Sequence, residues 1–334
     1  MKILLTGATG FVGRNYLLRL LKDDTYDEIL VPVRSPEKLE QQLREEGIEQ
    51  IPARLKIQKA SAPDWGNYTW EVEHVVHSAG VVMAPSPEEY DSVNVEGTLN
   101  LLAKLVRPEK ILILSSHAAA GPCAPPIEVR EEQHADAPVT WYGRSKLKME
   151  KEARQKYPHL PCLYLRPPMI LGPRDSASLP LFVLGKQWLQ VKPGLREKLY
   201  SYIAVEDLLS AIQAALVAPG SWSDSPHQHY FVCAPIPVSD RSLICGAAAT
   251  FEKPGRIVPI PLFVVRALST VVGLVPSWSR KIPNLSPDRA REIWPDRWVI
   301  SPAAFEKRFG WTAAQDLPTT LAAASHWYQQ AGLL

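Results

Sequence analysis

The chain has 334 residues, enough for one large domain or two closely packed ones with a sizeable hydrophobic core. Hydrophobic residues make up 46% and charged residues 22% of the sequence, as in an ordinary globular protein. The 37 Lys and Arg residues nearly balance the 35 Asp and Glu residues, and no long basic run occurs. The composition therefore argues against a nucleic-acid-binding protein.

Cysteine spacing and the N-terminus indicate the compartment. Cys123, Cys162, Cys233 and Cys245 form no CxxC pair and match no zinc-ligand spacing, so we expect free thiols and no metal site. The apolar run at the N-terminus is too short for the hydrophobic region of a signal peptide, and it leads directly into a glycine-rich turn. We therefore expect a cytoplasmic protein.

The first half of the chain alternates short apolar runs with amphipathic stretches, which is typical of βαβ units on a parallel sheet. The predicted strands are 2–6, 28–33, 55–59, 72–78, 110–115 and 162–166. The predicted helices are 11–21, 36–46, 87–106 and 142–156, and a further helix at 205–217 returns to this half. The sequence thus predicts an α/β fold, a doubly wound parallel sheet of the Rossmann type with helices on both faces.

The second half has a looser pattern, and the prolines become denser after residue 120. We expect a smaller C-terminal α+β lobe. The predicted ranges are 1–168 and 201–218 for the first domain, and 169–200 and 219–334 for the lobe. Apolar residues run over 260–275, but Arg266 interrupts them and a membrane span needs about 20 such residues. We expect a packed lobe helix or pocket wall there and no transmembrane segment, with a weak peripheral membrane contact as the alternative.

A glycine-rich turn, TGATGFVG, stands directly between the first predicted strand and the first predicted helix. Glycine allows a tight turn and a close approach of the backbone to a pyrophosphate, which then meets the free N–H groups of the helix N-terminus. In this strand–turn–helix context the motif predicts a dinucleotide site. The expected contacts are Thr6, Gly7, Thr9, Gly10, Phe11, Val12 and Gly13.

The end of the second predicted strand indicates which dinucleotide binds. An acidic residue there would accept hydrogen bonds from the ribose hydroxyls of NAD. Here Arg34 occupies the position, Ser35 follows, and Lys38 lies one helical turn later. Because a guanidinium pairs well with a phosphate, these three predicted contacts favour NADP(H) over NAD(H). The alternative is that Arg34 is a solvated surface charge stacked on adenine.

Tyr142 and Lys146 lie four residues apart in a predicted helix and therefore project from one face. A phenol normally titrates near pH 10, and a neighbouring ammonium group favours the phenolate. Tyr142 would then pass a proton to or from a substrate oxygen while a hydride moves. Lys146 would also hold the nicotinamide ribose.

Further short motifs occur in a fixed order along the chain. They are VHSAG at 76–80, NVEGT at 94–98, a serine pair ending at 116, LRPP at 165–168 leading to GP at 172–173, and VED at 205–207. Together with the glycine-rich turn and the Tyr–Lys pair, this order resembles the extended short-chain dehydrogenase/reductase family over nearly the whole chain. The motifs are most similar to the branch that contains dihydroflavonol reductases and 3β-hydroxysteroid dehydrogenases.

The resemblance implies roles for residues. Ser116 would hydrogen-bond the reacting oxygen and complete a catalytic set with Tyr142 and Lys146, and His77 would pack beneath the cofactor as a structural residue. The family implies further cofactor contacts at Ser78, Ala79, Gly80, Asn94, Ser115, Tyr142, Lys146, Pro167 and Met169.

The chain also departs from the family pattern. Ser61 lies in Ala60-Ser61-Ala62, where many members carry Gly-Asp-Leu, so its hydroxyl would replace the carboxylate that binds the adenine amino group. Met169 stands where nucleotide-sugar members carry Asn, and AAAG at 118–121 replaces their Tyr-Gly. The last two departures point away from a nucleotide sugar and towards an apolar substrate.

The sequence therefore predicts an NADP(H)-dependent oxidoreductase that reduces a ketone or aldehyde of a mainly apolar small molecule, or oxidises the alcohol. The first alternative is a nucleotide-sugar epimerase or dehydratase with recycled NAD. The second is a non-catalytic dinucleotide-sensing protein. Family members often pair the helices predicted at 87–106 and 142–156 across subunits, so we expect a homodimer.

Overall fold

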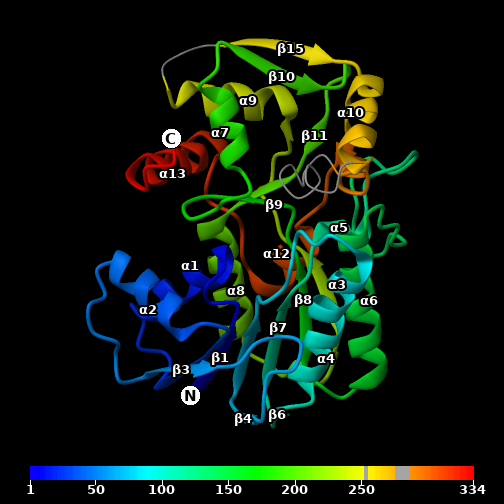
Figure 1. The fold of residues 1–334 in the computed structure, drawn as a ribbon. Coiled ribbons are helices and arrows are strands. Elements are labelled where there is room, and N and C mark those ends of the chain that lie inside the picture. Colours follow the sequence, from blue (N-terminus) through cyan, green and yellow to red (C-terminus); the bar gives the residue numbers. More distant parts are fainter. Residues whose placement is uncertain (252–254, 275–285) are drawn as a thin grey trace. The chain divides into compact units, whose positions relative to one another are not determined.

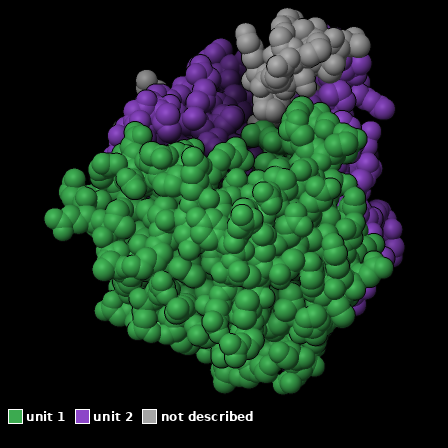
Figure 2. All heavy atoms as spheres, turned by 60° about the horizontal axis from the view of Figure 1, so that its bottom comes forward, with its two compact units in different colours: residues 1–116, 145–166, 212–230 green, residues 117–144, 167–211, 231–334 purple. Residues whose placement is uncertain are grey.

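The computed structural model describes residues 1–251, 255–274 and 286–334 (Figure 1). The chain forms two compact units (Figure 2). The first unit comprises residues 1–116, 145–166 and 212–230, and the second comprises 117–144, 167–211 and 231–334. Compared with the predicted ranges, residues 117–144, 167–168 and 201–211 belong to the second unit, and 219–230 to the first.

A seven-stranded sheet lies at the centre of the first unit. Its strands lie side by side in the order β13 (Gln228–Phe231), β8 (Cys162–Arg166), β7 (Lys110–Leu114), β5 (His74–His77), β1 (Lys2–Thr6), β2 (Glu28–Val33) and β3 (Leu55–Lys59). The neighbours from β8 to β3 are paired in parallel. The order in which the chain adds strands to the sheet reverses between β1 and β5. Open sheets of this kind bind ligands at such a point, beside the carboxyl ends of the strands.

The predicted α/β fold is confirmed, and its strands read as apolar runs because both faces of the sheet are covered. Helices α1 (Phe11–Leu20) and α2 (Pro36–Glu45) cover one face, and α4 (Gly97–Leu102) and α6 (Trp141–Lys156) cover the other (Figure 1). The core between these layers includes Val75, Ile111 and Ile113, which are fully buried. Strand β13 was not predicted, because its sequence QHYF carries little apolar signal.

The prediction of one continuous helix over 87–106 is wrong for the middle and the end of this segment. The chain forms α3 (Pro87–Tyr90), a π-helical turn at Asp91–Glu96 and then α4. Leu105 and Val106 form the short strand β6, which pairs with β4 (Trp70–Glu71). The helix ends early because these two residues pair with a strand far away in sequence, which no local pattern reveals.

The second unit combines helices with short strands, as predicted for an α+β lobe. Strand β9 (Met169–Leu171) pairs with β12 (Tyr202–Ala204), β10 (Leu189–Pro193) pairs with β15 (Arg256–Ile260), and β11 (Leu199–Tyr200) lies between β14 (Val238–Ser239) and β16 (Arg297–Trp298). The helices are α5 (His117–Ala120), α7 (Leu179–Gly185), α8 (Val205–Val217, which continues into the first unit), α9 (Asp240–Ala249), α10 (Leu262–Leu274), α12 (Ala303–Phe309) and α13 (Leu317–Gln330). The core of the second unit includes the buried side chains of Phe182, Ala247 and Tyr328.

The apolar stretch predicted at 260–275 contains α10, and Val275 lies outside the described residues. Val265 and Ser269 are buried, whereas Phe263, Leu268 and Val271 are exposed. Within the described parts of the chain, no helix combines the length and the apolar composition that crossing a bilayer requires. All four cysteines are free thiols, as expected.

Candidate dinucleotide site and catalytic residues

The chain enters α1 through a turn that only glycine fits. Gly7 has a φ of +75°, and a Cβ atom there would lie 2.7 Å from the backbone nitrogen of Ala79. A Cβ atom at Gly13 would lie 2.2 Å from the carbonyl oxygen of Gly7. Helix α1 begins at Phe11, and it has Gly10 as its N-cap residue, no side-chain cap and no acidic residue in its first turn. Its first N–H groups are therefore available to an anionic ligand.

A cavity of about 310 Å³ opens in the first unit where β1, β2, β3 and β5 end. It brings together ten of the predicted cofactor residues, Gly7, Thr9, Gly10, Arg34, Ser35, Lys38, Ser61, Ser78, Ala79 and Gly80. The sequence did not point to the remaining lining residues, Pro32, Val33, Ala60, Ala62, Trp65, Val81 and Val93. Most of these are apolar, so they lacked a chemical signature. The glycine turn, the helix N-terminus and the cations together fit a dinucleotide.

The other ten predicted contacts are not among the residues that line this cavity and stay predictions. Thr6, Phe11, Val12 and Gly13 flank the lining residues in sequence but do not line the cavity, and neither do Asn94, Ser115 and Lys146. Tyr142, Pro167 and Met169 belong to the second unit.

His77 holds the end of β5 through both of its ring nitrogens. Thr6 Oγ1 lies 2.7 Å from Nδ1, and Thr98 Oγ1 lies 2.9 Å from Nε2. Because Thr98 donates its own proton to the carbonyl oxygen of Asn94, it accepts the Nε2 proton of His77. Burial and, to a smaller extent, the charge of Lys146 together lower the pKa of His77 to about 3, so the ring is neutral. These contacts support the structural role expected for His77.

Asn94 positions the cavity wall through its side-chain amide. Its Nδ2 donates to the carbonyl oxygen of Val81 at 3.1 Å and to Ser145 Oγ at 3.0 Å. Its Oδ1 accepts from the backbone N–H of Val81 at 2.9 Å. Asn94 therefore holds the chain after β5 against α6, and its direct contact with the cofactor stays a prediction.

Lys146 is buried in the first unit, and its Nζ donates to the carbonyl oxygen of Leu114 at 2.9 Å. Burial lowers its pKa to about 8, while the nearby Glu150 acts in the opposite direction. A Cβ atom built on Gly80 would lie 3.3 Å from Nζ. The ammonium group therefore lies just behind a residue that lines the cavity.

A buried ionic network lies one helical turn after Lys146. Glu150 and Arg166 form an ion pair at 2.6 Å, with both side chains almost fully buried. Ser115 Oγ donates to Glu150 and so joins this network, and its contact with the cofactor stays a prediction. Ser116 lies two residues after the end of β7 at Leu114, because the strand ends one residue earlier than predicted, and its catalytic role stays a prediction.

The N-terminus of α6, which carries Tyr142, is held within the second unit. The backbone N–H of Trp141 donates to Asp288 Oδ2 at 3.0 Å, and that of Gly143 donates to Thr140 Oγ1 at 3.2 Å. The Arg289 guanidinium lies 5.9 Å from the centre of the Tyr142 ring. Sequence reasoning missed Asp288 and Arg289, because their contacts join residues 147 positions apart.

Residues 3–230 match the model of the NAD dependent epimerase/dehydratase family. The chain belongs to this family. This confirms the predicted extended short-chain dehydrogenase/reductase type and, at the level of the family, an NAD(P)-dependent enzyme.

Individual relatives are distant. The chain is 25% identical to the ceramide reductase of Caulobacter vibrioides over 99% of this chain and 96% of that protein. It is 27% identical to a probable UDP-glucuronate 4-epimerase of Rhizobium meliloti over 54% of this chain and 57% of that protein. A solved UDP-glucuronic acid 4-epimerase from Bacillus cereus, in complex with UDP-glucuronic acid and NAD, has a TM-score of 0.76 at 17% identity and covers 99% of this chain and 100% of its own. That likeness shows the shared fold.

Proposed function

We propose that the chain is a hydride-transfer enzyme that reduces the carbonyl group of a mainly apolar small molecule, or oxidises the alcohol, with NADP(H) as the cofactor. The observation that carries this proposal is the cavity itself. It combines a glycine turn, a helix N-terminus without a cap and two cationic side chains, and the ammonium group of Lys146 lies directly behind Gly80. When bound, the dinucleotide would supply or accept the hydride.

The cavity residues would hold the dinucleotide at two points. The N–H groups at the start of α1 would bind the pyrophosphate. Arg34 and Lys38 are exposed at the cavity, and their side chains have no ion pair within the described residues. No Asp or Glu occurs among the residues that line the cavity. These side chains would therefore pair with a 2′-phosphate, which supports NADP(H), although the similar solved epimerase contains NAD.

Tyr142 would act as the proton donor in the reducing direction, and Ser116 would orient the reacting oxygen. Lys146 supports this role because it lies four residues after Tyr142 on α6, and its buried positive charge favours the phenolate form of a nearby phenol. The same ammonium group would bind the nicotinamide ribose.

The substrate class rests on two observations. The ceramide reductase relative spans almost the entire chain, whereas the probable UDP-glucuronate 4-epimerase matches just over half of it. Met169 and the sequence AAAG at 118–121 also depart from the pattern of nucleotide-sugar enzymes.

A nucleotide-sugar epimerase or dehydratase with recycled NAD is the second candidate. The family description, two UDP-glucuronate 4-epimerases among the curated relatives and the solved structures favour it. Taken together, the comparisons support this candidate better than carbonyl reduction, whereas the residues at the cavity and after β8 favour the reductase.

The nucleotide released from purified, denatured protein separates the two candidates. A recycled cofactor stays bound through turnover, so near-stoichiometric NAD⁺ would overturn the reductase proposal. An empty protein that prefers NADPH in titration and oxidises it with apolar ketones or aldehydes would support the reductase. Cofactor binding without any turnover would favour the non-catalytic sensor. The cytoplasmic location and the homodimer remain predictions.

A further inference from the structure

Large apolar side chains are exposed together on one part of the second unit. Trp188 is 77% exposed, Leu195 is 70% exposed and Phe263 is 73% exposed. Leu189 and Val191 on β10 are also exposed. Burying this much apolar surface in contact with a partner is favourable, and apolar patches of this kind mark interaction sites on folded proteins.

The two strands and the helix that carry most of these side chains adjoin one another. Leu189 pairs with Arg256 in the parallel register of β10 and β15, so the two side chains share one side of the strand pair. At the far end of β10, the backbone N–H of Gly194 donates to the carbonyl oxygen of Ile260 at 2.7 Å. A Cβ atom at Gly194 would lie 3.5 Å from Leu262 Cδ2, which places the start of α10 beside the end of β10. We call Trp188, Leu189, Val191, Leu195 and Phe263 the apolar face.

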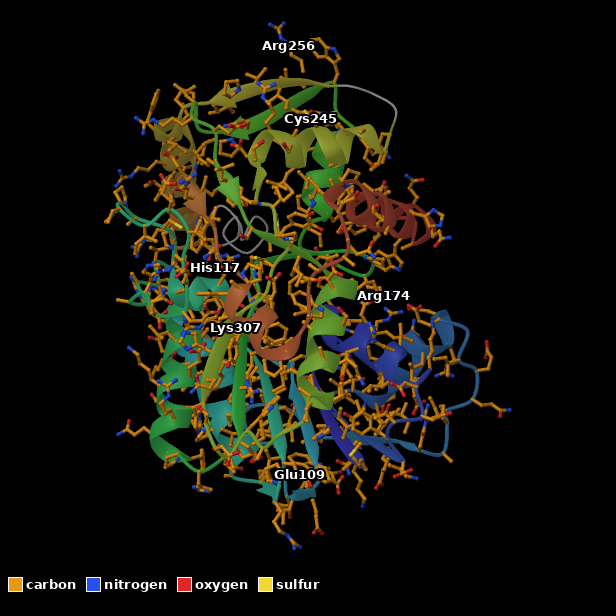
Figure 3. All side chains as sticks on the ribbon, turned by 180° about the vertical axis from the view of Figure 1, so that it is seen from behind. Glu109, His117, Arg174, Cys245, Arg256 and Lys307 are labelled. Carbon is orange, nitrogen blue, oxygen red and sulfur yellow. The ribbon has the colours of Figure 1, made fainter. Side chains whose placement is uncertain are left out.

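The strands and the helix that carry most of the apolar face are cationic, while Glu197, two residues after Leu195, is the exposed acidic residue beside it. Neither β10, β15 nor α10 contains an Asp or Glu residue. Arg256 and Arg266 are exposed, and neither guanidinium has an ion pair within the described residues. Figure 3 shows Arg256 pointing away from the strand pair. Lys192, the third cation of these three elements, is buried and paired with Asp240 at 2.6 Å, so it contributes little to the surface charge.

We propose that the apolar face docks on an anionic lipid bilayer, with Phe263 and Trp188 in the headgroup–acyl boundary and Arg256 and Arg266 against lipid phosphates. An exposed Trp beside cations is typical of a membrane-interface element. Helix α10, with 13 residues, is about 20 Å long, too short to cross a hydrocarbon core of about 30 Å. A second copy of the chain fits less well, because a symmetric contact would bring the arginines of both copies together.

The test uses the full-length protein and two kinds of vesicle, phosphatidylcholine alone and phosphatidylcholine with added phosphatidylglycerol. We expect co-sedimentation with the anionic vesicles, weakened by salt, and a blue shift of tryptophan fluorescence that Trp188→Phe removes. Phe263→Ser should abolish most of the binding. Arg256→Gln and Arg266→Gln should each weaken binding about fivefold.

The matched control is Val217→Ser, which removes an apolar side chain that is 58% exposed at the end of α8 in the first unit. It should bind vesicles as the wild type does. Equal binding to neutral and anionic vesicles, no binding at all, or unchanged binding by Phe263→Ser would overturn the proposal. Self-association without lipid that Phe263→Ser abolishes would assign the face to a second copy instead. Because melting temperatures identify misfolded variants, only folded ones enter the comparison.

Discussion

Gly80 lies directly against Lys146, and a Cβ atom at position 80 would meet the Lys146 ammonium group at 3.3 Å and Asn94 Oδ1 at 2.9 Å. The absence of a side chain here lets the cavity wall approach the ammonium group. A methyl group at this position would displace Lys146, Asn94 or the cavity wall itself.

Gly80→Ala should therefore impair the site while leaving the fold intact. Overpacking costs about 1–3 kcal/mol, and displacement of the cavity wall should raise the dissociation constant for NADPH by about tenfold. Calorimetric titration would measure this constant, and circular dichroism would confirm the fold. Unchanged affinity and turnover would show that the wall moves freely and that Gly80 is not needed for the site.

Arg34→Ala should weaken NADPH binding and leave NADH binding nearly unchanged. A hydrogen bond to a charged group contributes about 1.5–3 kcal/mol, so the dissociation constant for NADPH should rise about 10- to 100-fold. Arg44→Ala is the matched control, since Arg44 lies on α2, the helix that follows Arg34, but pairs with Glu40 and does not line the cavity. Equal losses for both nucleotides would exclude Arg34 as a phosphate contact.

Tyr142→Phe should lower turnover by about 10²- to 10⁴-fold, because the phenol supplies the proton, while the affinity for the cofactor should stay within about twofold. Tyr157→Phe near the end of the same helix should have no such effect, because no hydrogen bond of its hydroxyl lies within the described residues. Steady-state kinetics and nucleotide titration measure the two quantities. Full activity in Tyr142→Phe would rule out the proposed mechanism.

His77 should make the protein sensitive to acid. Its pKa is lowered from 6.5 to about 3 in the folded protein, so the unfolded chain binds its proton first as the pH falls. The stability that this neutral ring contributes is present above pH 6.5 and is lost as the pH falls towards 3. The difference in free energy of unfolding between wild type and His77→Gln, from urea titrations, should shrink over this range. A constant difference would contradict the buried, neutral ring.

Glu150→Ala should destabilise the protein strongly, because the buried Arg166 guanidinium then loses its ion pair with the Glu150 carboxylate. Breaking a buried ion pair in this way costs about 3–5 kcal/mol. Glu152→Ala, two residues further along α6, removes only an exposed contact to Lys148 at 3.8 Å and should change stability by less than about 0.5 kcal/mol. Chemical denaturation compares the variants, and similar small losses in both would mean that the buried pair is not needed for stability.

The local sequence determined most of the sheet and the glycine turn. The strands around Val75 and Ile111 are apolar runs of a length that only buried strands explain, and Gly7 and Gly13 stand between a strand and a helix. These signals depend on neighbours within a few residues, so they can be interpreted from the sequence alone. The cavity residues that follow strand ends, such as Arg34 and Ser78, were predictable for the same reason.

Only the tertiary structure decided the rest. The helix predicted at 87–106 is interrupted, and residues at its end pair with a strand distant in sequence. Contacts between residues far apart in the chain also bond Asn94 to Val81 and Ser145, and cap α6 with Asp288. The apolar segment 260–275 gave no sign of which side of α10 is buried, since apolar residues occupy both sides of that helix. Such features arise from long-range packing, in which each contact depends on a partner that the local sequence does not specify.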